Sequence, residues 1–229
     1  MDAAAPGPAR PARADAREWI HLLRAPGLGA GDLRRLVERL GSPATVLGAG
    51  DPAWQALGLQ APTRTWLRHP DHARLDADLA WLAQPGHHLL AWDDPDYPAL
   101  LRQAPSPPAA LWVVGDPTAL WLPQVAIVGS RNASLGGRDT AASFARSLTG
   151  AGMAITSGLA LGIDAAAHAA TLAAGGRTLA VMGTGPDRIY PSLHHDLAAR
   201  IARSGCLATE FPPGTGPRRS HFPSRNRIV

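Results

Sequence analysis

The chain has 229 residues, of which 45% are hydrophobic, enough to bury the core of one large domain or two modest ones. A single cysteine excludes a disulfide framework and a cysteine-rich metal site, and no apolar run reaches the roughly 18 residues of a membrane helix. All 22 basic residues are arginines against 18 acidic ones, a formal net charge of +4 that by itself selects no class of partner.

The first residues, 1–14, are rich in alanine and proline and lack the apolar centre of a secretory signal, so we expect a disordered leader. Apolar residues at helical spacing then predict helices over residues 17–24 and 32–40. The second of these is expected to be capped by Asp32 and closed by Gly41. Shorter helices continue the pattern, and their tryptophans are expected to pack in the core.

The connection between the first two helices, Pro26-Gly-Leu-Gly-Ala-Gly31, resembles the helix-hairpin-helix module, whose backbone amides bind nucleic-acid phosphates. In a plain helical hairpin the same glycines only permit the turn. The nearby basic residues are limited to Arg34 and Arg35, so we favour the plain hairpin for this connection and keep the likeness in fold.

Near residue 85 the pattern changes from helical to strand-and-turn, and we place a domain boundary there, between a helical domain over residues 15–84 and a second domain over residues 85–229. The second domain is expected to begin with two strands and a short helix, over residues 88–92, 111–115 and 98–103. His87 and His88 have no third ligand at a useful spacing, so no metal site is expected.

Strands and helices alternate in the rest of the chain, a pattern that predicts a doubly wound parallel sheet. The expected strands cover residues 124–128, 153–156, 178–182 and 206–209, and the expected helices cover residues 135–149, 165–174 and 192–203. The carboxyl ends of parallel strands meet at one edge, where ligands of open α/β sheets bind. The glycine-rich segments that follow these strands should therefore gather there and offer backbone amides to an anion.

The stretch QVAIVGSR, residues 124–131, is the clearest of these units. Its unalternating apolar run is typical of a central strand that is covered on both faces. Gly129 then allows a sharp turn, which places Arg131 at the carboxyl edge to meet an anion. The segment 211–229 adds four arginines and no acidic residue, which equals the whole formal charge surplus.

Two nucleotide-binding fingerprints are absent. The turn after residue 128 has no G-x-G-x-x-G pattern and the second strand ends at Ser157 rather than at a ribose-binding acid, which excludes an NAD enzyme. The chain has no lysine, which excludes a nucleoside-triphosphate P-loop. We expect no cofactor.

Candidate catalytic groups can be named, but their spacing matches neither a nucleophile elbow nor a pair of carboxylates. They are Ser130, Ser157, Asp164, His168 and Glu210. Asp164 is better explained as a helix N-cap. His168 fits a packed histidine as well as a functional one, and we expect no enzymatic activity.

Four ordered blocks of the sequence resemble the DNA-processing protein A (DprA/Smf) family. They are Ile127-Val-Gly-Ser-Arg131, Ser157-Gly-Leu-Ala-Leu-Gly-Ile-Asp164 with Ala167-His168, Gly183-Thr-Gly185 with Ile189-Tyr-Pro191, and Phe222-Pro-Ser-Arg-Asn-Arg-Ile228. The resemblance covers residues 84–229 and, more loosely, the helical part before them.

This resemblance implies a cytoplasmic bacterial protein that binds single-stranded DNA without sequence preference, protects incoming strands during natural transformation and helps to load the RecA recombinase. It also implies a homodimer, no membrane association, and a Rossmann-like domain behind a helical domain with a helix-hairpin-helix or sterile-alpha-motif-like fold. Arg131 resembles the phosphate-gripping arginine, and Phe222 could stack on a base, whereas Phe211 is expected to pack within its loop. The implied DNA-binding and phosphate-binding residues are Gly129, Ser130, Arg131, Ser157, Gly158, Leu161, Gly162, Asp164, Gly183, Thr184, Gly185, Phe222, Arg225, Asn226 and Arg227.

The sequence departs from the family pattern in two respects. Some relatives carry a basic residue in place of Leu161 and many in place of Ser224, so the positive groove is expected to be weaker here. Relatives also continue beyond the position of Val229 with further strands, a dimer surface and often a winged-helix domain. We therefore expect a C-terminally truncated chain with an incomplete sheet, in which dimerisation and RecA contact are in doubt.

Two rival functions belong to other classes. A phosphoribohydrolase on a related scaffold would need a catalytic glutamate after a glycine-rich turn, and the segment that begins at Gly183 lacks one. A scaffold that binds RecA and contacts DNA only indirectly is the other rival.

Overall fold

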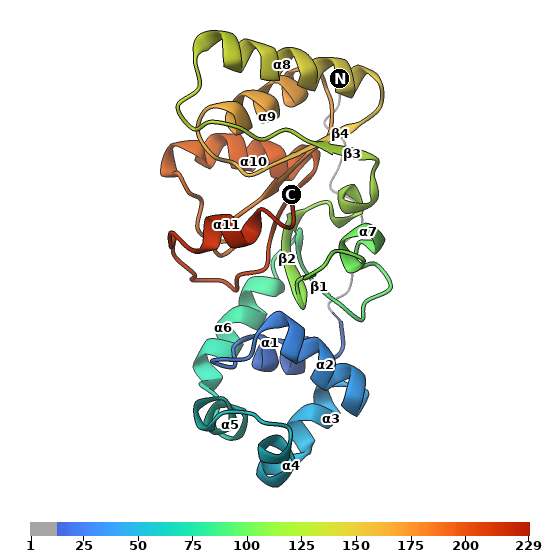
Figure 1. The fold of residues 1–229 in the computed structure, drawn as a ribbon, viewed down its shortest axis with the longest axis vertical. Helices are drawn as coiled ribbons and strands as arrows, with labels where there is room; N and C mark the ends of the chain where they lie inside the picture. Colours follow the sequence, from blue (N-terminus) through green and yellow to red (C-terminus); the bar gives the residue numbers. More distant parts are fainter. Residues whose placement is uncertain (1–12) are drawn as a thin grey trace. The chain divides into compact units, whose positions relative to one another are not determined.

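The computed structural model describes residues 13–229, drawn in Figure 1. The predicted disordered leader lies outside the described residues except for Arg13 and Ala14. The described chain forms two compact units, one of residues 13–85 and 89–111, the other of residues 86–88 and 112–229. The strand-and-turn stretch 89–111 thus groups with the helices that precede it.

The helical unit is a set of short helices around buried apolar side chains, among them Trp19, Ile20 and Leu33. These helices are α1 Ala16–Leu23, α2 Ala30–Leu40, α3 Pro43–Gly48, α4 Gly50–Ala56, α5 Ala61–Arg68, α6 His72–Leu82 and the short α7 Ala99–Arg102. A buried bidentate ion pair ties α1 to α6, because Arg24 donates to both carboxylate oxygens of Asp78, at 2.7 and 2.5 Å. The helical character predicted for this part of the chain is confirmed.

The predicted N-cap of α2 is wrong. Gly29, with extended backbone angles, precedes the first helical residue, whereas Asp32 lies inside the first turn and pairs with Arg35. The helix begins at Ala30, three residues before the position at which a cap at Asp32 would start it. The predicted end is correct, since Gly41 adopts the left-handed conformation with φ of 92°.

The second unit carries most of a six-stranded sheet with the order β1-β2-β6-β5-β4-β3. The strands are β1 His87–Ala91, β2 Ala110–Gly115, β3 Gln124–Ala126, β4 Ala154–Ser157, β5 Thr178–Val181 and β6 Cys206–Thr209. Strands β3 to β6 pair in parallel, and β2 pairs with β6 in antiparallel register, from Trp112 opposite Thr209 to Gly115 opposite Cys206. The predicted Rossmann-like α/β fold is confirmed.

The connections of the parallel strands all step in one direction along the sheet. They run through α8 Leu135–Gly150, α9 Ile163–Ala173 and α10 His195–Ser204, with the short turns η1 Pro117–Trp121 and η2 Ser192–His194 and the terminal α11 His221–Arg225. Figure 1 shows α8, α9 and α10 side by side. Ile155 of β4 packs with alanines of α8 and α9, and Leu207 of β6 packs with α10. The carboxyl ends of β3 to β6 therefore share one edge.

Strand β3 is not the central strand that its composition predicts. Among the described residues it lies at the end of the sheet and pairs only with β4. Ile127 packs towards α8 and α9, but Val128 is 62% exposed. An apolar, β-branched run is compatible with one covered face, so composition alone does not separate an edge strand from a central one.

Behind the carboxyl edge, His168 of α9 is fully buried and neutral. The hydroxyl of Thr178 donates to the carbonyl oxygen of Ile155 at 2.7 Å, and therefore accepts from Nδ1 of His168 at 2.6 Å. Burial, together with the nearby His194 and Arg225, lowers the pKa of His168 to about 3. This geometry is that of a packed, hydrogen-bonded histidine, one of the two roles that the sequence leaves open for His168.

The buried His168 predicts acid sensitivity. The unfolded chain binds a proton at this residue below pH 6.5 and the folded chain does not, so stability falls as the pH drops from about 6.5 towards 3. At pH 5 the loss relative to pH 7.5 should be about 2 kcal/mol from this residue. Urea unfolding at both pH values measures this loss of folding free energy, and the loss should be smaller in the variant His168→Asn. An unchanged pH dependence in the variant would assign the acid sensitivity to other groups.

Candidate nucleic-acid interface

The turn after β3 is the most open part of the carboxyl edge. Gly129, Ser130, Arg131 and Asn132 are all exposed. The Ser130 hydroxyl accepts from the Asn132 amide at 3.1 Å, and the Ser130 carbonyl accepts from the Ile163 amide at 3.2 Å. These bonds fix the turn against the start of α9 and leave the Arg131 side chain to project from it.

Two glycines allow this close contact between the turns. A Cβ at Gly129 would lie 2.6 Å from Cγ1 of Ile163. A Cβ at Gly162 would overlap the Ser130 carbonyl oxygen and lie 2.7 Å from that of Arg131, and Gly162 also has a φ of 79°. The need for glycine at these positions therefore comes from packing and backbone conformation.

Several backbone polar groups of the turn after β4 are bound within the protein. Asp164 accepts from the amides of Gly158 and Ala160 with the same oxygen, at 3.1 and 3.2 Å, and Nδ1 of His194 lies 2.9 Å from the Leu159 carbonyl oxygen. The Ser157 hydroxyl donates to the Ile127 carbonyl at 2.6 Å. Only Leu161, 41% exposed, presents a side chain to solvent from this turn.

The predicted N-cap role of Asp164 is wrong. Gly162 occupies the N-cap position of α9, and Asp164 lies in the first turn of the helix. The positive φ of Gly162 lets the helix begin directly after the turn, so the carboxylate of Asp164 reaches back to the turn's amides instead. Asp164 is 5% exposed and acts as an internal brace.

Arg225 braces the same turn from the other side. It is 5% exposed, and its Nη1 donates to the carbonyl oxygens of Gly158, at 2.7 Å, and Val181. A Cβ at Gly158 would lie 2.5 Å from the guanidinium. Burial lowers the pKa of Arg225, the carboxylate of Asp164 opposes this shift, and the nearby Arg131 adds to it. The guanidinium of Arg225 is thus committed to holding backbone.

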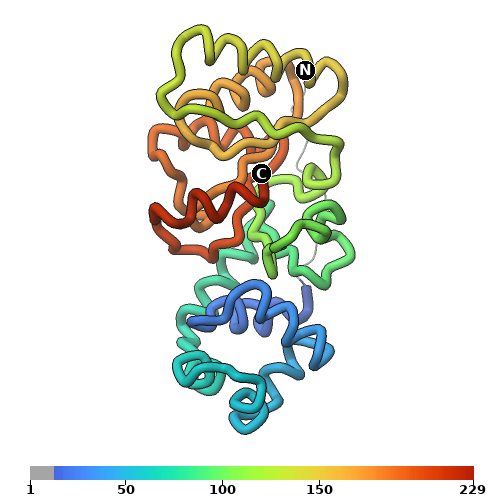
Figure 2. Tube along the Cα trace, in the orientation of Figure 1, coloured from blue at the N-terminus to red at the C-terminus, as the bar shows by residue number. Residues whose placement is uncertain are grey.

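The turn after β5 is buried under the C-terminal segment. Gly183, Thr184 and Gly185 are all buried, and the Gly185 amide donates to the Thr215 carbonyl at 2.8 Å. The ring of Phe222 lies so close that a Cβ at Gly183 would be 3.0 Å from it. In Figure 2 the C-terminal segment is red and lies against the orange part of the chain.

The C-terminal segment brings an aromatic ring beside Arg131. The guanidinium carbon of Arg131 lies 5.2 Å from the centroid of the Phe222 ring, and the centroid of the Tyr190 ring lies 5.5 Å from the same point. Arg227 instead makes a bidentate ion pair with Glu210, with one contact at 2.8 Å. Asn226 is exposed and accepts from Nε of Arg225 at 3.2 Å. Phe211 stacks on His221 at 4.0 Å.

The structure thus brings the predicted residues of the first two turns together with Phe222 and Arg225. It places Gly183, Thr184 and Gly185 in the interior and directs Arg227 to Glu210. Of the three predicted arginines, Arg131 is the exposed one, and it forms no ion pair within the described chain. Tyr190 is a further exposed side chain at this site, and its aromatic character between a glycine turn and a helix was the available sequence signal.

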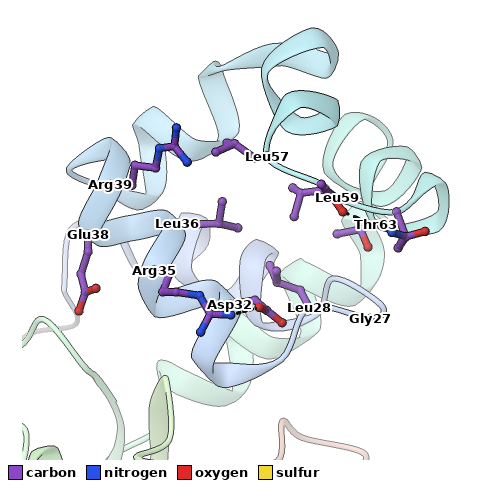
Figure 3. Close-up of a pocket in the computed structure, with 12 residues that line it drawn as sticks. Gly27, Leu28, Asp32, Arg35, Leu36, Glu38, Arg39, Leu57, Leu59 and Thr63 are labelled. Atoms are coloured by element: carbon purple, nitrogen blue, oxygen red, sulfur yellow. Dashed lines mark hydrogen bonds and ion pairs between the residues drawn. The ribbon is translucent and has the colours of Figure 1, made fainter.

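The helical unit has a separate cavity of about 710 Å³, lined in part by the glycine-rich hairpin (Figure 3). Leu36 and Leu59 point towards each other across it. The charged side chains that line this cavity are of both signs, namely Asp32, Arg35, Glu38 and Arg39. A phosphate would meet the Asp32 carboxylate beside Gly29, which supports the plain hairpin.

Comparison with known proteins identifies the family. The profile of the family described as DNA recombination-mediator protein A matches residues 88–229. The chain belongs to this family. Protein Smf of Escherichia coli is 36% identical over 217 residues, which cover 94% of this chain and 57% of that protein. DNA processing protein DprA of Streptococcus pneumoniae is 40% identical over 136 residues, covering 59% of this chain and 48% of that protein.

Solved structures of the family agree with this fold. DNA processing protein A from Streptococcus pneumoniae matches 93% of this chain and 73% of its own with a TM-score of 0.79 and 32% identity. The protein from Helicobacter pylori, whose structure concerns its single-stranded DNA binding mode, matches 58% of this chain and 61% of its own with a TM-score of 0.54 and 32% identity. The chain spans about half the length of the curated relatives it matches.

Two features are absent from the part of the chain that the structure describes. No group of three or more histidine, cysteine, aspartate or glutamate side chains is arranged to hold a metal ion. None of the described helices combines the length and the apolar composition that crossing a membrane requires.

The contact between the two turns predicts a large effect of Gly162→Ala. The new methyl group meets the Ser130 and Arg131 carbonyls in addition to the strain of a positive φ, so the free energy of unfolding should fall by about 3 kcal/mol or more. Gly175→Ala is the matched control, because Gly175 has a φ of 71° and open space around it, and should cost about 1 kcal/mol. Urea unfolding compares them, and equal losses would show that backbone strain alone requires Gly162.

Proposed function

We propose that this protein binds single-stranded DNA without sequence preference, as a recombination mediator of the DNA processing protein A family. The observation that carries the proposal is the exposed guanidinium of Arg131, which forms no ion pair among the described residues and lies over the Phe222 ring, itself beside the Tyr190 ring, at the carboxyl edge of the sheet. Family membership and the single-stranded DNA binding of the Helicobacter pylori relative support it.

The chemistry of this edge suits a flexible polyanion. A guanidinium can bind a phosphate oxygen pair whatever the base, and aromatic rings can stack on bases of any sequence. In this proposal Arg131 grips a phosphate, Gly129 and Ser130 shape its turn, and Asn226 offers a polar side chain at the border. The base of the site is the turn after β4, which is held in place by Ser157, Gly158, Gly162, Asp164 and Arg225. The segment that carries Phe222 is supported by Arg227 and by the turn of Gly183, Thr184 and Gly185.

The acidic groups around the site favour binding over hydrolysis. Asp164 is occupied by two backbone amides, Glu210 by Arg227, and Asp187 accepts from the Gly214 amide at 2.7 Å. A glycosidic bond cleavage would need a carboxyl group that is available to the substrate. We therefore propose a nonenzymatic function.

Family membership supports a proposal about the wider role. We propose that the whole protein protects incoming strands during natural transformation, helps to load RecA on them and acts as a cytoplasmic homodimer. The described chain spans about half of its curated relatives, so the RecA and dimer contacts are proposed for the whole protein rather than for a surface described here.

Arg131→Ala tests the phosphate contact. It should weaken poly-dT binding by roughly tenfold and reduce the salt dependence of log K by about 0.7, the value for one phosphate contact on a single strand. Fluorescence anisotropy at several salt concentrations measures both. Arg203→Ala, which removes an exposed arginine from the last turn of α10, is the control and should leave the slope unchanged. Parent-like binding by Arg131→Ala would remove the residue from the site.

Arg225→Lys tests whether Arg225 holds the turn after β4 or binds a DNA phosphate itself. The substitution keeps the charge but changes the contacts to Gly158 and Val181, so affinity should fall severalfold while the salt slope stays constant. Because Arg225 acts through the turn that positions Arg131, adding Arg225→Lys to Arg131→Ala should cause little further loss. A slope reduced by about 0.7, or additive losses, would instead indicate that Arg225 binds phosphate itself.

A further inference from the structure

Tyr190 presents the accessible aromatic surface of the site. The residue is 47% exposed, and its ring lies 5.5 Å from that of Phe222 with an interplanar angle of 42°. Phe222 itself is only partly exposed, because the Arg131 guanidinium covers it on one side and the Gly183 backbone lies against it. Phe222 therefore orients its neighbour, and Tyr190 offers a ring to an incoming ligand.

Other exposed apolar side chains lie on the segments that border this ring. Leu161 is 41% exposed on the turn after β4, and Leu193 is 68% exposed three residues after Tyr190. The contact between His194 and the Leu159 carbonyl holds these two segments together. An exposed tyrosine, packed beside a phenylalanine that also contacts a cation with no ion pair in the described chain, suits a ligand with a planar apolar face and a negative charge.

We propose that Tyr190 is the residue on which an unpaired nucleobase stacks, next to the phosphate held by Arg131. This inference rests on the proposed function and names the part of the strand that the site recognises. Bases in a duplex already stack on their neighbours, whereas the bases of a single strand can leave the stack and cover the tyrosine ring. Stacking of this kind accepts every base, so it adds affinity without sequence preference.

An abasic strand distinguishes stacking from phosphate binding. Poly-dT and an abasic deoxyribose-phosphate strand of the same length carry the same charge, and anisotropy gives the affinity of the full chain for each. Tyr190→Ala should weaken poly-dT binding roughly tenfold and leave the abasic strand unaffected. Tyr190→Phe should retain parent affinity because it keeps the ring. Phe144→Ala, which removes a 62% exposed ring from α8, is the matched control and should change neither affinity.

Three outcomes would overturn the inference. Equal losses on both strands would place the role of Tyr190 on the backbone or in the fold, and a loss in Tyr190→Phe would assign it to the hydroxyl group. Unchanged poly-dT binding by Tyr190→Ala would remove the residue from the interface. If the alanine variant unfolds, Tyr190→Leu keeps the packing against Phe222 without an aromatic face and answers the same question. Failure of the proposed function looks different, since Arg131→Ala would then bind both strands as the parent does.

Discussion

The backbone of Gly158 is held at its N–H by Asp164 and at its carbonyl oxygen by Arg225, and the turns of the carboxyl edge depend on this arrangement. The N–H of Gly158 donates to the Asp164 carboxylate, and the Arg225 guanidinium donates to the carbonyl oxygen of Gly158. Each charge would be costly to bury by itself, but the two lie near each other across one backbone unit, and each satisfies backbone groups that water cannot reach. The turn after β4 is rigid as a result, and it supports the turn that carries Arg131.

This arrangement changes the meaning of the basic C-terminal segment. Two of its arginines bind groups of the protein itself. Arg225 donates to backbone carbonyl oxygens, and Arg227 forms an ion pair with Glu210. Arg218 and Arg219 of this segment are exposed, as is Arg131, which the chain supplies from a different segment. A formal charge surplus in a segment therefore does not measure its contribution to binding, because buried partners use part of it.

The sequence predicts the fold better than it predicts which residues of the site hold the backbone and which are exposed to a ligand. Alternation of apolar runs and helical patterns is sufficient for β3 to β6 and α8 to α10, because each strand length and each glycine turn is a local property. The edge position of β3 is not local, since it depends on which strands pair. The backward reach of Asp164 to Gly158 and the burial of Arg225 are long-range contacts as well. Only the assembled fold shows that Gly158 lacks a side chain to admit a guanidinium.

The contact of Arg225 with the turn after β4 has a consequence for biosynthesis. Strands β3 to β6 and their connecting helices precede Arg225 in the chain, so they leave the ribosome before the residue that completes the turn after β4. A nascent chain that is interrupted between β6 and α11 contains every strand of the parallel sheet and Asp164, but it lacks the guanidinium that binds the Gly158 carbonyl and the segment that covers Gly183. The site proposed for DNA is therefore complete only after α11 has been translated.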